Sequence, residues 1–221
     1  MKSFFSFFHS IHLKRFLIVL ILFTFFVFVS AISYVSAVSN NIADSVFRLH
    51  VIANSDSNED QELKYKVRDA VLEYMNSITI DCSSKEESIQ IAKEHEDEFY
   101  KIAKQTIEEN GYDYSVNIKI GNFNFPTKTY GDISLPAGNY DALRIEIGNA
   151  SGQNWWCVMF PPLCFVDVSS GVVPDESKEI MQDNLSTEEY TLISDLNSSD
   201  VKFKFGLVEF FNNISFAKTT D

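Results

Sequence analysis

The sequence predicts an α+β fold. We expect a single exported domain in which helices pack on a mostly antiparallel sheet, in the rough order β-α-α-β-β-β with a C-terminal appendage. Three observations support this prediction. An apolar N-terminal segment precedes a polar chain of domain size. The next stretch holds one alternating segment and then two long amphipathic ones. After Gly111 the pattern returns to the two-residue period of strands, so helices and strands are segregated along the chain.

Residues 1–37 predict an export signal. They contain three basic residues and no acidic one, and residues 16–29 form an uncharged apolar run. Val35 and Ala37 occupy the −3 and −1 positions that a signal peptidase recognises. An uncleaved anchor is the alternative, because the apolar stretch through residue 38 has about 23 residues and is long enough to cross roughly 30 Å of hydrocarbon. In both cases the rest of the chain lies outside the membrane.

The chain is therefore predicted to have four parts. They are a signal peptide or anchor at 1–37, a linker at 38–45, a folded domain at 46–170 and an acidic extension at 171–221. Removing the three basic residues of the leader takes the formal charge from −13 to −16. Such an acidic surface repels nucleic acid and anionic lipid. We therefore expect no nucleic-acid partner, and membrane contact only through the N-terminal segment.

The folded part is predicted to begin with a strand, a turn and a helix. Residues 46–53 alternate between apolar and polar side chains, which predicts a strand. Ser57, followed three residues later by Asp60, is a helix start signal. Apolar residues from Leu63 to Tyr74 recur at helical spacing, so an amphipathic helix of about 18 residues follows.

The remaining elements follow from the same patterns. A second helix start at Ser83 and a stop signal at Asn110-Gly111 predict one helix between them. We expect strands at 114–120, 140–147 and 155–160, then a loop from Pro174, a short helix near 187–196 and a last strand at 201–205.

The first strand, turn and helix carry a concentration of polar side chains. These are Arg48, His50, Asn54, Asp56, Asp60, Lys64 and Arg68. The simpler interpretation is a solvated helix side with one Asp–Lys pair, together with a hydrogen-bonded structural histidine. The functional interpretation is one polar surface that receives a partner. The pattern alone leaves both interpretations open.

An enzymatic function is the main alternative to a binding function. In that hypothesis His50 acts as the base for a Cys157 nucleophile, and Asn54 or Asp56 orients the imidazole ring. It requires three distant elements to converge, and it leaves Cys164 without a role. The sequence contains no C-x-x-C pair and no G-x-G-x-x-G, Walker, G-x-S-x-G or H-E-x-x-H motif. We therefore predict no catalytic residue, no metal site and no cofactor.

Three stretches carry a family resemblance. They are RLHVIANSDSNEDQELKYKVRDAV at 48–71, LPAGNYDALRIEIG at 135–148 and NWWCVMFPPLCFVD at 154–167. Together, in this order and behind a signal segment, they resemble the signature blocks of the stage II sporulation protein R family, the intercellular signalling proteins of endospore-forming bacteria. The resemblance spans roughly residues 46–170, and the region beyond Asp167 matches only loosely.

The resemblance implies a ligand and not an enzyme. A family member is made in the forespore and exported across its membrane into the space between the two cells. There it activates a membrane-embedded aspartic protease, stage II sporulation protein GA, which then cleaves the sigma-E precursor. An exported hydrolase acting on cell wall or peptide and a structural spore-envelope component are the alternative classes.

The partner-contact residues and the cysteines complete the expectation. We predict contacts through Arg48, His50, Asn54, Asp56, Asp60, Lys64 and Arg68, followed by Trp155 and Trp156. Export favours a disulfide between Cys157 and Cys164, which would close a turn around the proline pair Pro161-Pro162. Two reduced buried cysteines, a nucleophile, a metal ligand and an intermolecular pair remain the alternatives. Cys82 is predicted to be a lone thiol.

Overall fold

A computed structural model describes residues 2–80, 82–164 and 173–194. The chain divides into two compact units, residues 1–38 and 39–221. The first helix, α1 (Lys2–Asp44), supplies all the described residues of the first unit. Within it, residues 12–31 form a stretch that is long and apolar enough to cross a membrane, with a mean hydropathy of 2.3 and no residue buried. Length and composition suit an anchor and a signal sequence equally, so cleavage after Ala37 stays a prediction.

The second unit is built on a four-stranded sheet with the order β2-β5-β1-β6. Its strands are β1 (Phe47–Ile52), β2 (Val116–Phe125), β5 (Gly138–Ile147) and β6 (Asn154–Phe160). Strand β1 pairs in parallel with β5, whereas the β2–β5 and β1–β6 pairs are antiparallel. The predicted α+β class with a mostly antiparallel sheet is confirmed.

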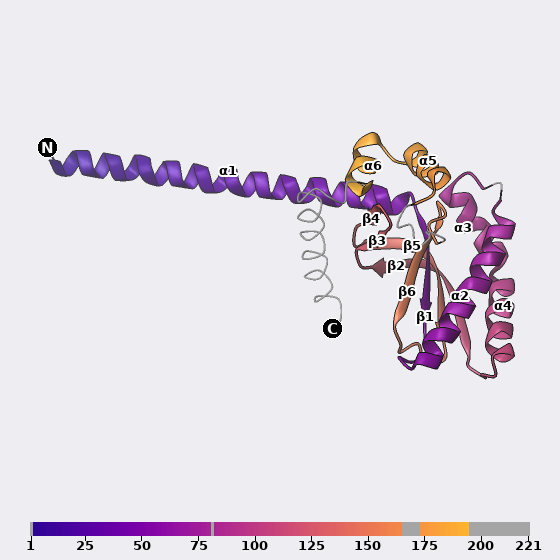
Figure 1. The fold of residues 1–221 in the computed structure, drawn as a ribbon. Helices are drawn as coiled ribbons and strands as arrows, with labels where there is room; N and C mark the ends of the chain where they lie inside the picture. The colour runs from indigo at the N-terminus through magenta and orange to yellow at the C-terminus, as the bar shows by residue number, and fades with distance from the viewer. Residues whose placement is uncertain (1, 81, 165–172, 195–221) are drawn as a thin grey trace. The chain divides into compact units, whose positions relative to one another are not determined.

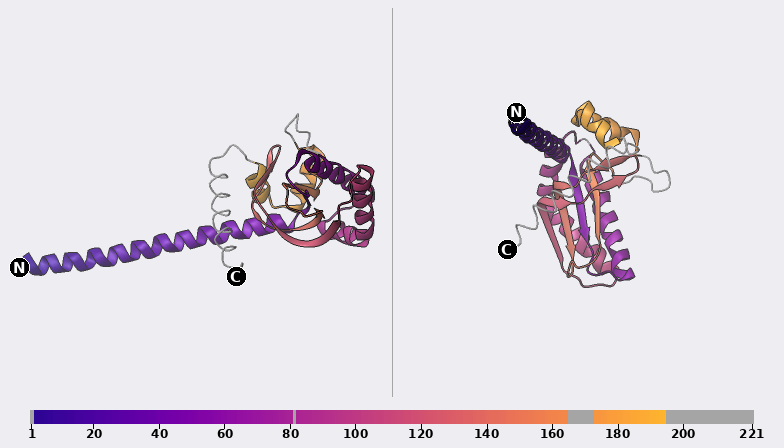
Figure 2. Two further views of the ribbon diagram at one scale, coloured as in Figure 1. Left: turned by 90° about the horizontal axis from the view of Figure 1, so that it is seen from below. Right: turned by 90° about the vertical axis from the view of Figure 1, so that its left-hand side faces the viewer.

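Three helices cover one face of this sheet. They are α2 (Asn58–Ile78), α3 (Lys85–Glu94) and α4 (Glu96–Glu109), and Figures 1 and 2 show α2 and α4 side by side along it. The core between the sheet and the helices consists of buried apolar side chains. Its members include Leu49, Val51, Leu63, Val67, Val71, Phe99, Ala103, Ile107, Leu143, Ile145 and Cys157. The Ser57 hydroxyl caps α2 by accepting a hydrogen bond from the Asp60 backbone N–H.

The structure differs from the expected element list in three places. The single helix expected before Gly111 is two helices, α3 and α4, which meet at His95. A small hairpin, β3 (Lys128–Tyr130) and β4 (Ile133–Leu135), was not predicted. Helix α5 (Asp175–Asn184) replaces an expected loop, while α6 (Thr187–Ser194) lies where a short helix was predicted. The strand predicted at 201–205 lies outside the described residues.

The segment predicted as a linker is helical and packed. Residues 39–44 are the last turns of α1, and Ile42 and Ala43 are 0% and 4% exposed. The Asn41 amide donates a hydrogen bond to the Glu189 carboxylate at 2.8 Å. The buried Lys85 ammonium donates to the Ala43 carbonyl oxygen and pairs with Asp141 at 2.7 Å. The folded unit therefore starts within two residues of the predicted cleavage site.

Candidate functional site

The loop that joins β1 to α2 and the turn that joins β5 to β6 are hydrogen-bonded to each other. We call residues 53–57 and 148–153 the interlocked loops. Asn54 Oδ1 accepts from the backbone N–H of Asn149 at 3.0 Å, and Asp56 Oδ1 accepts from that of Gln153 at 2.7 Å. In return, the Ser151 hydroxyl donates to the Asn54 carbonyl oxygen at 2.7 Å. Backbone and side-chain groups are thus paired across two segments far apart in sequence.

Two glycines make this close approach possible. Gly148 has a φ of 56°, and a Cβ there would overlap the Asn54 side chain. A Cβ at Gly152 would overlap the backbone of Ser55. The loops therefore fit together only when both positions lack a side chain.

The Asp60 carboxylate is the polar centre of this region. Asp60 is only 4% exposed. Its Oδ2 accepts hydrogen bonds from the Asn54 amide at 2.8 Å and from the Ser55 hydroxyl at 2.5 Å. Burial opposes ionisation of Asp60, but hydrogen bonds from Ser55, Asn54 and Tyr114 outweigh it and lower the pKa of the carboxyl. Asp60 therefore fixes the loop as a hydrogen-bonded anion.

Lys64 lies one helical turn beyond Asp60 and is 1% exposed. Its ammonium donates to Gln61 Oε1 at 2.5 Å and to the Gln153 carbonyl oxygen at 3.2 Å. Burial, with Arg68 nearby, lowers the pKa of Lys64. The side chain ties α2 to the β5–β6 turn and pairs with no carboxylate among the described residues.

Arg48 is completely buried on the sheet face that the helices leave uncovered. Its guanidinium carbon lies 4.1 Å from the ring centre of Phe125 and 4.6 Å from that of Tyr140. Nη2 donates to the Tyr130 hydroxyl at 2.6 Å. Within the described residues, Nε and Nη1 have no hydrogen-bond acceptor and no carboxylate pairs with the cation. Aromatic faces and the Tyr130 hydroxyl are thus the groups that contact this buried charge.

His50 lies beside Arg48 on the same face of β1. It is 6% exposed, and its Nε2 donates to Asn154 Oδ1 at 2.7 Å, which places a hydrogen on Nε2. Its ring stacks on Trp156 with the ring centres 5.7 Å apart. Burial lowers the pKa of His50, and the charges of Arg144 and Arg48 act in the same direction.

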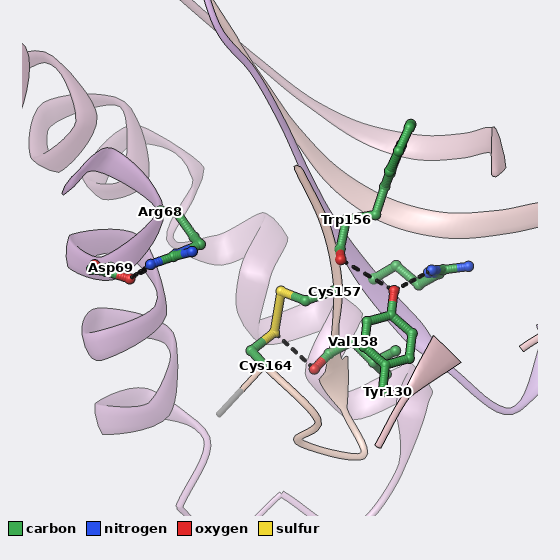
Figure 3. The surroundings of a disulfide bond; sticks show 8 residues. Arg68, Asp69, Tyr130, Trp156, Cys157, Val158 and Cys164 are labelled. Carbon is green, nitrogen blue, oxygen red and sulfur yellow. Dashed lines mark hydrogen bonds and ion pairs between the residues drawn. A yellow bond between two sulfur atoms is a disulfide. The ribbon is translucent and has the colours of Figure 1, made fainter. Parts of the chain in front are cut away.

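The two tryptophans of β6 project to opposite faces of the sheet. Trp155 packs edge-on against Tyr65 of α2, and the Arg68 guanidinium lies 4.4 Å from the Trp155 ring centre. Arg68 also pairs with Asp69 at 2.6 Å (Figure 3). On the other face the Lys128 ammonium lies 4.5 Å from the Trp156 ring centre. Each tryptophan is therefore covered by a cation from a different element.

The turn after β6 is closed by a disulfide between Cys157 and Cys164, whose Cα atoms are 5.1 Å apart (Figure 3). Cys157 pairs with Leu49 in the sheet and faces the helices, whereas His50 pairs with Trp156 and faces the other side. The structure thus separates the His50–Cys157 pair of the hydrolase hypothesis by the thickness of the sheet. Cys82 is a free, half-buried cysteine.

The predicted contact residues divide into two groups. Arg48, His50, Asp60 and Lys64 are buried. Asp56 is exposed, and Asn54, Arg68, Trp155 and Trp156 are partly exposed. The turn GNASGQN at 148–154 gave a usable signal for the interlocked loops in its glycines. Sequence reasoning missed Tyr65, Lys128 and Tyr130, because only the fold brings them to the tryptophans. No group of three metal-binding side chains occurs in the part of the chain that the structure describes.

Comparison with known proteins places this region in a family context. The profile of the family described as Stage II sporulation protein R (spore_II_R) matches residues 43–170. The Stage II sporulation protein R of Bacillus subtilis (strain 168) is 39% identical over 163 residues, which cover 74% of this chain and 72% of that protein. No solved structure matches the chain. The matched region contains β1, the interlocked loops, both tryptophans and both bonded cysteines.

Proposed function

The chain belongs to the stage II sporulation protein R family, and from this premise we propose that it is an exported signal that activates a protease during endospore formation. It is made in the forespore and crosses the forespore membrane into the space between the two cells. There it is either released by cleavage after Ala37 or held by its N-terminal helix. Its target is the membrane-embedded aspartic protease stage II sporulation protein GA, which then processes the sigma-E precursor.

The observation that carries this proposal is the extent of the family match. Residues 43–170 run from the packed end of α1 through the whole four-stranded sheet to beyond the Cys157–Cys164 disulfide. The family relationship therefore covers the whole four-stranded sheet and the helices α2 to α4 that pack on it, and it supports a sporulation role. Activation of the protease and processing of sigma-E are the parts that we add.

A signalling role also suits the chemistry of the buried polar groups. His50 Nε2, the Asp60 carboxylate and the Lys64 ammonium hydrogen-bond to neighbouring side chains and backbone groups of the same domain. The cysteine at position 157 is bonded to Cys164. These groups stabilise the conformation of the domain. A protein whose partner performs the chemistry needs only a stable conformation and a contact surface.

The mechanism we propose is differential binding. An activator shifts its receptor towards the active arrangement only by as much as it binds that arrangement better than the inactive one. The partly exposed Arg68, Trp155 and Trp156 are suited to direct contact, because Arg and Trp are common interface anchors. The buried Arg48, His50, Asp60 and Lys64 act through the positions of these anchors and of the interlocked loops.

Co-expression in a non-sporulating host tests the proposal. The host carries the protease and the sigma-E precursor, with or without the full-length chain, and precursor cleavage is followed by immunoblot. We expect cleavage that depends on this chain. Equal cleavage with and without it, at matched protease levels, contradicts the proposal. A Cys157→Ser, Cys164→Ser double variant that keeps part of the cleavage would in addition exclude Cys157 and Cys164 as nucleophiles.

A further inference from the structure

Strand β6 is an edge of the four-stranded sheet, with β1 as its one neighbour in the sheet. Its backbone groups alternate between pointing to β1 and pointing outward, as in any antiparallel pair. The carbonyl oxygens of Trp156 and Val158 point outward, because they accept from the Tyr130 hydroxyl at 3.1 Å and from the Leu163 N–H at 3.0 Å. The outward set therefore consists of residues 154, 156 and 158.

One part of this edge is closed and another is open. The turn closed by the disulfide covers the edge at Val158, through the Leu163 hydrogen bond. In contrast, this alternation directs the N–H of Trp156 and both backbone groups of Asn154 away from β1, and outside the strand pairing the described residues offer them no hydrogen bond. The Asn154 carbonyl and the Trp156 N–H are the two groups that one residue of an added parallel strand would bond. The edge offers a short length of unpaired strand.

Aromatic side chains stand on both sides of this open length. Trp155, with Tyr65 behind it, lies on the helix side, and Trp156 lies on the other. Tyr65 is 37% exposed, and both tryptophans are partly exposed. A peptide added to the edge would thus have its alternate side chains received by an indole on each face.

Three cations lie close to the aromatic rings around the open edge. Arg68 and Lys128 lie over the two tryptophan rings, and Lys64 lies beneath Tyr65 at 4.6 Å from its ring centre. Lys64 and Lys128 pair with no carboxylate in the part of the chain that the structure describes. Arg68, by contrast, pairs with Asp69 at 2.6 Å. In a chain of formal charge −13, the two lysines without a carboxylate partner favour a contact that supplies negative charge.

We propose that the open edge of β6 at residues 154–156 binds an extended, acidic peptide segment of the partner by strand addition. The inference rests on the proposed function only in that a protein partner exists. Backbone hydrogen bonds to Asn154 and Trp156 provide the pairing. Trp155 and Trp156 receive the side chains, and Arg68 and Lys128 receive the carboxylates.

A proline substitution separates strand addition from ordinary side-chain contact. Trp156→Pro and Trp156→Ala both remove the indole, but only the proline removes the outward N–H, and an edge strand tolerates proline at such a position. In the co-expression host with the full-length chain, Trp156→Pro should lower precursor cleavage by about a further tenfold relative to Trp156→Ala, the effect of one lost backbone hydrogen bond. Protein levels and thermal unfolding show whether each variant folds.

Charge reversal gives a test that does not depend on the proline variant. Lys128→Glu should lower cleavage by about tenfold, whereas Lys101→Glu, an exposed lysine of α4, should leave it unchanged. A photo-cross-linking residue at the exposed Gln153 should capture a partner segment rich in Asp and Glu, and one at Tyr100 should not.

The outcomes separate this inference from the proposed function. If the wild-type chain gives no cleavage, the proposed function fails. If the wild-type chain gives cleavage but Lys128→Glu behaves like Lys101→Glu, or Gln153 captures a segment without acidic residues, the strand-addition site is wrong and the proposed function stands. A folded Trp156→Pro variant that equals Trp156→Ala overturns the inference in the same way.

Discussion

Asn54 Oδ1 accepts a hydrogen bond from the backbone N–H of Asn149, 95 residues further along the chain, at 3.0 Å. The same amide donates through Nδ2 to the buried Asp60 carboxylate. One side chain thus connects the N-terminus of α2 to the turn that precedes the tryptophan strand. This relationship explains how polar residues in a predicted turn determine the position of a surface formed by distant elements.

The interlocked loops predict that alanine substitution lowers stability at one glycine and not at another. Gly152→Ala should lower the free energy of unfolding by about 1–3 kcal/mol, because its Cβ overlaps the Ser55 backbone and the loop must move. Gly121→Ala is the matched control, since the nearest atom to its Cβ is 3.8 Å away. Urea unfolding of both variants measures the difference. Equal stability of the two variants would show that the loops do not interlock.

Asp60 should be important for stability in a way that its neighbour Glu59 is not. Asp60→Asn places an amide against the Asn54 and Ser55 donors and should cost about 1–3 kcal/mol. Glu59→Gln changes an exposed carboxylate in the same first turn of α2 and should change stability little. Chemical denaturation at neutral pH compares them. A smaller loss for Asp60→Asn than for Glu59→Gln contradicts the assignment.

Tyr130 should stabilise the folded protein through its hydrogen bond with Arg48. Tyr130→Phe removes the oxygen that accepts from Arg48 Nη2, leaving a buried cation with one hydrogen bond fewer, so we expect a loss of about 1–3 kcal/mol. Tyr100→Phe, on the exposed side of α4, removes the same hydroxyl from an exposed ring that is 45% accessible and should be neutral. Thermal unfolding distinguishes the two. A neutral Tyr130→Phe variant would mean that the aromatic rings alone compensate Arg48.

The burial of Arg48 also shows where sequence reasoning fails. The alternation of residues 46–53 correctly predicted β1 and its helix-facing side. It assigned Arg48 and His50 to a polar surface, because a strand pattern does not reveal what covers the second face. Phe125, Tyr130 and Tyr140 cover it from elements many residues away, and two of these side chains lie in or beside a hairpin that was not predicted.

Among the helices, too, some features were predictable from the sequence and others were not. The α2 start at Ser57 was predictable because its hydrogen bond is local. The break between α3 and α4 was not, because the residue there, His95, carries no glycine or proline signal. Its Nδ1 lies 2.6 Å from the Tyr74 hydroxyl of α2, a tertiary contact. Helix α5 was missed because it buries only Ser177 and Met181 and shows no apolar stripe.

His50 predicts a pH dependence of stability. Burial lowers the pKa of His50 in the folded protein, so below its ordinary value of about 6.5 the unfolded chain takes up the proton first. The free energy of unfolding should therefore fall as the pH drops below about 6.5, with a slope of up to roughly 1.4 kcal/mol per pH unit from this group. His50→Gln should flatten the profile. An unchanged slope in that variant would assign the dependence to other groups.

The disulfide predicts that three cysteine variants lose stability and signalling to the same extent. Cys157→Ser, Cys164→Ser and the double variant should each lose about 2–3 kcal/mol, because each opens the same short loop. Since this loop closes the edge of β6 at Val158, all three should also reduce signalling to a similar extent. Unfolding and precursor cleavage measured on the same variants check this. Loss in only one single variant would instead indicate a separate chemical role for that cysteine.

The most direct test of protease activation is the rate of sigma-E precursor cleavage by the protease in proteoliposomes, titrated with the full-length chain. We expect a rate that rises with the concentration of the chain and saturates, and that vanishes when the catalytic aspartates of the protease are replaced. A rate independent of the chain, or cleavage that persists with the inactive protease, would contradict activation by this chain.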